Sequence, residues 1–71
     1  MIRFNTVNGI GDTVLVAQRD LIENMNAALR QGWRTNGALL YLGEVFFNGG
    51  VNHVFCQPML GLTENIDSAS E

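Results

Sequence analysis

The first quarter of the chain combines short apolar runs with glycine-rich positions. Residues 2–7 alternate roughly between apolar and polar side chains, which predicts a strand. Residues 8–12 read Asn-Gly-Ile-Gly-Asp and include the Asn-Gly pair that is the strongest short hairpin signal. Residues 13–17 are β-branched and apolar, and they predict a second strand. A helix that starts at Thr13 is the weaker alternative, because β-branched side chains are restricted in helices.

The middle of the chain has the spacing of one helix. Apolar side chains recur on one face of a 3.6-residue period at Leu21, Met25, Ala28 and Leu29. This pattern predicts a helix from Arg19 to Gln31. Gly32 suits the left-handed position that ends a helix, and Trp33 then packs back onto the last turn. We therefore expect Trp33 to be a core residue and Gly32 to have a positive φ.

A long apolar segment follows the predicted helix. Residues 38–47 are almost entirely apolar, residues 48–50 read Asn-Gly-Gly, and residues 51–57 return to an apolar pattern. This sequence predicts a long β-hairpin. We expect Gly43 to mark a bulge or bend, and Pro58 to lie at a strand end or edge because proline cannot donate to a ladder.

The outgoing strand of this hairpin is apolar on both faces. Strict alternation assigns Leu39, Tyr41, Val45 and Phe47 to one face and Ala38, Leu40, Leu42 and Phe46 to the other. A single helix covers only one face of a sheet, which leaves the second face for another copy of the chain. The predicted oligomer interface consists of Leu40, Leu42, Phe46, Phe47 and Val54.

Together these segments predict an α+β fold. We expect a small antiparallel sheet of about four strands, in the order β-β-α-β-β, with one helix packed on one face. Residues 1–60 would form a single domain. Residues 61–71 are small, polar and acidic, and they are expected to form a flexible tail.

Composition excludes several classes of protein. The chain has 71 residues, with 46% hydrophobic and 15% charged residues, a balance that excludes a disordered protein. No apolar run approaches the roughly 20 residues of a membrane span, and the N-terminus has no signal-peptide pattern. Its one cysteine excludes an internal disulfide framework. We expect a cytoplasmic protein that does not bind membranes.

The charge distribution disfavours nucleic acid as a partner. The chain has four arginines and no lysine, and residues 1–60 balance these arginines with four acidic residues, so the net charge of −3 belongs to the tail. Affinity for nucleic acid depends on phosphate neutralisation by Lys and Arg. A neutral body also does little to oppose self-association.

From the helix onward the chain resembles a small family of bacterial and phage proteins, DUF1737. The resemblance rests on Leu21, Met25-Asn26, Leu29, Gly32-Trp33, Gly37 and Gln57-Pro58-Met59. It covers about 45 residues and implies a compact α+β fold with a helix on an antiparallel sheet. It implies no activity. Because such small proteins are frequent among phage accessory genes, the resemblance makes a protein that acts on a host factor, in the host cytoplasm, conceivable.

Catalytic and metal-binding patterns are weak. His53 and Cys56 lie three residues apart on one predicted strand, so they point to opposite faces. From opposite faces they can neither bind one metal ion nor act together as a cysteine nucleophile and its histidine base. Residues 9–13 resemble a phosphate loop, but they precede a predicted strand and the chain has no lysine to reach a phosphate. Asp20 and Glu23 are expected at the helix N-terminus, where acidic groups are favourable. We expect no enzyme, no cofactor and no metal.

Two functions remain. The first is a noncatalytic homo-oligomer, most simply a dimer, that binds another protein and assembles through the 38–57 hairpin. The second is a binder of a small anionic ligand, such as a nucleotide signal, through Arg30, Trp33 and Arg34. Arginine and tryptophan together hold nucleotides by bidentate phosphate contact and by stacking.

Overall fold

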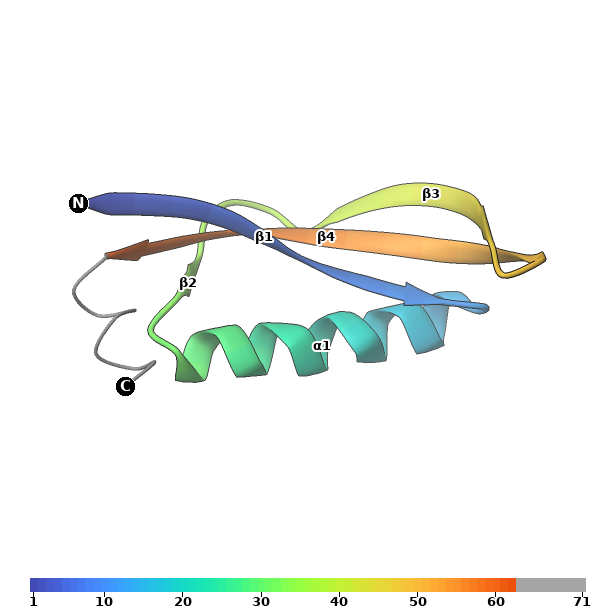
Figure 1. Cartoon of the computed structure of the whole chain (residues 1–71), viewed down its shortest axis with the longest axis horizontal. Helices are drawn as coiled ribbons and strands as arrows, with labels where there is room; N and C mark the ends of the chain where they lie inside the picture. Colours follow the sequence, from blue (N-terminus) through green and yellow to red (C-terminus); the bar gives the residue numbers. More distant parts are fainter. Residues whose placement is uncertain (63–71) are drawn as a thin grey trace.

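The chain folds into one helix packed on a four-stranded antiparallel sheet (Figure 1). The computed structural model describes residues 1–62. In chain order the elements are β1 (Ile2–Gly11), α1 (Val14–Arg30), β2 (Arg34–Thr35), β3 (Leu40–Phe47) and β4 (Gly50–Leu62). Strand β4 is central, with β1 on one side and both β2 and β3 on the other. The predicted α+β class, with one helix on an antiparallel sheet, is confirmed.

The order of the elements differs from the prediction. Residues 8–11 continue β1 instead of forming a turn, and residues 14–17 begin α1 instead of forming a strand. Thr13 is the N-cap, and its hydroxyl accepts a 3.1 Å hydrogen bond from the N–H of Val16. A side chain that caps the first turn outweighs the poor helix propensity of the β-branched residues. The order is therefore β-α-β-β-β.

The end of α1 agrees with the sequence. Gly32 has a φ of 100° and donates a 3.1 Å hydrogen bond to the carbonyl of Leu29. The N–H of Trp33 donates a 3.1 Å bond to the carbonyl of Ala28. These two bonds form a Schellman motif, which directs the chain from the helix toward the sheet. The predicted positive φ of Gly32 is confirmed.

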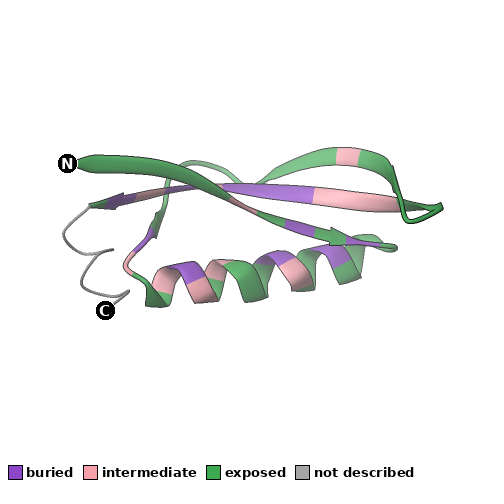
Figure 2. Cartoon of the chain, viewed as in Figure 1, coloured by how far each residue is buried: buried purple, intermediate pink, exposed green. Residues whose placement is uncertain are grey.

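The core lies between α1 and one face of the sheet (Figure 2). It has two clusters, one formed by Ala17, Leu21 and Phe55 and the other by Ala28, Trp33 and Met59. Val7 packs against both clusters. Trp33 is only 8% exposed, which confirms its prediction as a core residue.

Helix α1 approaches β1 very closely at two glycines. A Cβ atom at Gly9 would lie 2.3 Å from the carbonyl oxygen of Ala17, and one at Gly11 would lie 2.5 Å from the Ala17 nitrogen. Both distances are far below van der Waals contact. The glycines that the sequence pattern assigned to a turn therefore allow the helix to pack on the strand.

Pro58 lies in the middle of the central strand, so its predicted position at a strand end or edge is wrong. The N–H of Asn36 donates a 2.9 Å hydrogen bond to the carbonyl of Pro58, so this residue faces the gap between β2 and β3. Because no strand pairs with Pro58 at that gap, the absence of an N–H on proline costs the sheet no ladder hydrogen bond. The buried Gln57 spans the same place, donating 3.0 Å bonds to the carbonyls of Gly37 and Pro58.

A bulge lies near the start of β3, and β4 extends beyond the predicted hairpin. The pairing of β3 with β4 shifts register between Tyr41 and Gly43, and Gly43 has a φ of 102°, which confirms the predicted bulge. At the other end, β4 continues through Leu62, two residues into the segment predicted as a tail. The remaining part of that prediction, residues 63–71, lies outside the described residues.

Candidate functional site

Within the described part of the chain, one complete face of the sheet has no helix on it. In β4, Phe55 and Met59 pack against α1, so the even-numbered residues between them point to the other side. The antiparallel register extends this open face to the even-numbered residues of β1. We define the open face by these apolar and sulfur-bearing side chains: Ile2, Phe4, Ile10, Leu40, Val45, Phe47, Val54, Cys56, Pro58, Leu60 and Leu62. Among residues 1–62, no element covers it (Figure 1).

The open face is apolar and nearly uncharged. Across β1, β3 and β4 it has no charged side chain, and Arg34 of β2, which pairs with Leu60, borders it. Phe4 is 72% exposed, and Leu40 and Val45 are also exposed. Contiguous exposed apolar surface on a small protein is typical of a contact surface for another molecule.

The bulge changes which hairpin residues belong to this face. Leu40 pairs with Cys56 on the open face, and Tyr41 packs against Phe55 on the helix side. After the bulge the parity is reversed, so that Val45 and Phe47 join the open face. The strict alternation used for the sequence therefore fails beyond Tyr41. The sequence predicts a bulge at Gly43, and the extra residue of a bulge exchanges the two faces for every residue that follows it.

The five predicted interface residues are consequently not all on one face. Leu40, Phe47 and Val54 lie on the open face, whereas Phe46 pairs with Val51 on the helix side. Leu42 is the extra residue of the bulge and is exposed. Phe46 is 87% exposed because β3 has no substantial contact with α1. Sequence analysis did not find the contribution of β1, whose Phe4 and Ile10 belong to the same surface.

His53 and Cys56 lie apart, as their spacing predicted. The Nδ1 atom of His53 is 2.9 Å from the Tyr41 hydroxyl, and the two rings are stacked with centroids 6.1 Å apart. Cys56 is a free, buried thiol of the open face, and His53 lies on the helix side opposite Glu44. Within residues 1–62, no three His, Cys, Asp or Glu side chains gather in a group that would hold a metal.

The alternative ligand site consists of arginine side chains around Trp33, whose indole is already packed in the core. Trp33 is buried between α1 and β4, and the guanidinium carbon of Arg3 lies 5.9 Å from its ring centroid. Arg34 donates a 2.9 Å hydrogen bond from Nη1 to the carbonyl of Trp33, and Arg30 is exposed in the last turn of α1. A base could stack on Trp33 only after core or Arg3 contacts opened. The anionic-ligand function stays a prediction, and Arg3, which the sequence pattern did not single out, would belong to it.

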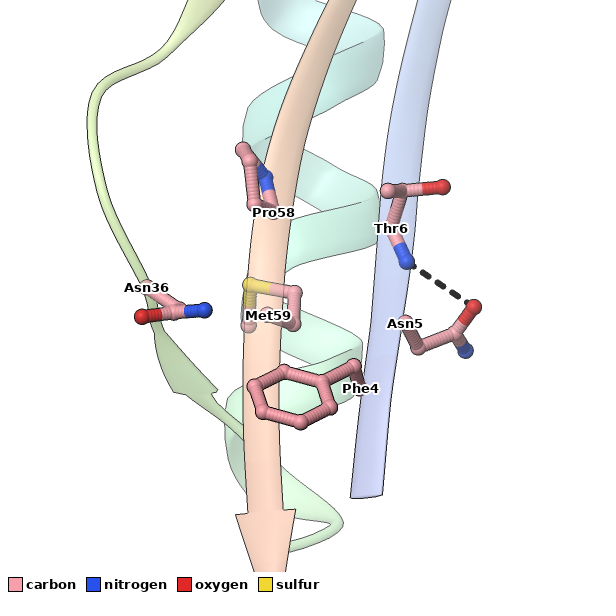
Figure 3. A pocket seen from close by; sticks show the side chains of 6 residues that line it. All are labelled: Phe4, Asn5, Thr6, Asn36, Pro58 and Met59. Atoms are coloured by element: carbon pink, nitrogen blue, oxygen red, sulfur yellow. Dashed lines mark hydrogen bonds between the residues drawn. The ribbon is translucent and has the colours of Figure 1, made fainter. Parts of the chain in front are cut away.

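Two hollows lie along the strands β1 and β4. One, of about 370 Å³, is lined by Phe4, Asn5, Thr6, Asn36, Pro58 and Met59 (Figure 3). The other, of about 300 Å³, is lined by Ile2, Gly32, Arg34, Leu60, Gly61 and Leu62. Both include open-face residues of each strand. The hollow beside Phe4 and Pro58 therefore indents the open face, and side chains of a partner could fill it.

Among the described residues, no helix has both the length and the apolar character that crossing a membrane requires. Comparisons of the chain with protein-family models, with curated proteins and with solved structures find no match.

Proposed function

We propose that this protein is a noncatalytic interaction protein that self-associates, most simply as a dimer, and that the open face of its sheet is the contact surface. The single observation behind the proposal is that, within residues 1–62, α1 packs on one face of the sheet and no element packs on the other. A sheet face this apolar is normally packed against another layer. A second copy of the chain would supply that layer.

The size of the open face suits this role. The molecule measures 40 × 22 × 17 Å, and the sheet extends along its longest dimension (Figure 1). Helix and sheet are stacked along the 22 Å dimension (Figure 1), so the open face measures about 40 × 17 Å. A stable protein contact buries roughly 600–1,000 Å² on each partner, a range that includes a face of this size. Small domains without disulfides or metals often depend on oligomerisation for stability. The oligomer would then present its remaining exposed side chains, including Phe46 on the helix side, to a further protein such as a host factor.

Light scattering at micromolar concentration tests the proposal. We expect a mass that is a multiple of the 7.8 kDa chain. Replacing two open-face side chains, Leu40→Asp with Val45→Asp, buries two carboxylates in the contact, so the assembly should dissociate. The matched control is Leu15→Asp, at an exposed position of α1.

Dissociation of both variants to the same extent would contradict the assignment to the open face. A wild-type protein of 7.8 kDa throughout the micromolar range would contradict self-association itself. Circular dichroism and the emission of buried Trp33 show whether each variant is folded.

A further inference from the structure

Strand β1 is an edge of the sheet, and its outer side has a regular pattern. Its pairing with β4 runs without a register shift from Ile2 to Gly11, so alternate residues direct their main-chain N–H and C=O groups away from β4. Two hydrogen bonds identify which residues these are. The N–H of Ile10 donates to the Asp20 carboxylate at 2.9 Å, and the carbonyl of Asn8 accepts from the Asn24 amide at 2.7 Å. The even-numbered residues therefore face outward.

Helix α1 protects only half of this edge. Asp20 and Asn24 are one helical turn apart, and they occupy main-chain groups of β1 from Asn8 onward. In the first half, the N–H of Thr6 donates a 2.8 Å bond to the side chain of its neighbour Asn5, which lies on the outer side of the strand (Figure 3). Within residues 1–62, Phe4 makes no hydrogen bond on this outer side of the strand.

We propose that residues 2–6 of β1 pair with the same residues of a second copy of this chain. The pairing would be antiparallel, across a twofold axis at Phe4. In this register Phe4 lies opposite the partner's Phe4, and Ile2 lies opposite the partner's Thr6. All three residues direct their main-chain groups outward, so the Phe4 pair can exchange two hydrogen bonds, and each Ile2–Thr6 pair can do the same once the Asn5 side chain releases the N–H of Thr6. The contact is self-complementary, as a twofold interface requires.

The limits of the free segment support this register. With the axis at Phe4, pairing extends to Thr6, and the groups that Asp20 and Asn24 occupy stay outside it. A register shifted toward the middle of β1 would have to displace both helix side chains.

The side chains of the segment are compatible with a second copy. The two Phe4 rings would be cross-strand neighbours on the open face, an arrangement that stabilises sheets. On the helix side Arg3 would lie opposite Asn5, with no like charges directly opposed, and Arg3 is directed toward Trp33. The segment has no proline, lysine or bulge, which are the common protections of an exposed edge. This contact uses the edge of the sheet and is separate from the open-face contact proposed above.

Two substitutions at one position test the pairing. Phe4→Pro removes the outward N–H and blocks an added strand, whereas Phe4→Ala keeps that N–H and removes the same ring from the open face. We expect Phe4→Pro to weaken self-association, measured by light scattering over a dilution series, at least ~10-fold more than Phe4→Ala, because two hydrogen bonds are lost per twofold contact. Equal effects of the two variants would overturn the edge pairing and leave the open-face contact standing.

Amide hydrogen exchange of the wild-type chain provides a test without substitutions. The amides of Arg3, Asn5 and Val7 point toward β4 and should be protected at every concentration. The amide of Phe4 should become protected only as the protein self-associates, with exchange slowed at least ~10-fold. Fast exchange at Phe4 under conditions where light scattering shows an oligomer would overturn the proposal, even if Phe4→Pro failed to fold. If Phe4→Pro dissociates the protein and the Leu40 and Val45 variant does not, the open-face proposal fails instead.

Discussion

Trp33 is the residue on which the second core cluster depends. Its indole packs with Ala28 and Met59, and it is buried directly after the turn at Gly32. Trp33→Ala should cost about 3–5 kcal/mol, the usual range for a large core aromatic. Small domains have a total stability of about 5–15 kcal/mol, so the variant should be marginally folded. Thermal unfolding followed by circular dichroism measures the loss.

Trp33→Phe is the matched control, since it keeps an aromatic ring in the core and should lose less stability. A melting curve of Trp33→Ala that coincides with that of the wild type would show that the indole contributes little to packing.

Gly9 is a residue whose role can be seen only in the folded chain. Any side chain there meets the main chain of α1 at Ala17 and Leu21. Gly9→Ala should therefore push the helix away from the sheet and cost at least about 1–3 kcal/mol, as other overpacking substitutions do. Chemical denaturation measures the change. In the control, Gly50→Ala, the added methyl group meets no atom within 4 Å, so its loss of stability should be clearly smaller.

At the scale of elements, the two ends of α1 differ in how far they could be predicted. The C-terminal end is a local event: Gly32 adopts a positive φ and two hydrogen bonds close the motif, so the sequence is sufficient. The N-terminal end of α1 depends on contacts with another element, so the local sequence is not sufficient to predict it. Thr13 and Val14 favour a strand by propensity, but the cap at Thr13 and the packing of Ala17 on β1 make them part of a helix.

The cap at Thr13 can be tested directly. Thr13→Ala removes the hydroxyl that accepts from Val16, and it should cost about 1 kcal/mol of folding stability. Thr13→Ser keeps an equivalent hydroxyl and should stay close to the wild type in the same denaturation experiment. If both variants lose the same stability, the cap does not hold the first turn.

At the scale of the molecule, the sequence predicted the architecture better than the surface. An α+β chain, one helix, a long hairpin and an apolar second face all follow from local patterns. The membership of the open face does not, because the bulge before Gly43 inverts the alternation and because β1 joins the surface through pairing with a strand more than 40 residues away. Asp20 illustrates the same limit. The sequence predicts it at the helix N-terminus, but the first turn of α1 has no acidic residue. The Asp20 carboxylate instead accepts a hydrogen bond from the main-chain N–H of Ile10 in β1.

The position of β4 in the chain has a consequence for synthesis on the ribosome. Among residues 1–62, strands β1, β2 and β3 each pair with β4 and with no other strand, and β4 follows all of them in the sequence. While β4 is still inside the exit tunnel, the nascent chain can form α1 from local contacts but has no template on which to build a sheet. The apolar residues of β1 and β3 then remain without a paired strand until β4, which ends at Leu62, has been synthesised and has left the tunnel. Assembly of the sheet therefore has to follow the synthesis of β4, and it is during this interval that chaperones and aggregation compete for the chain.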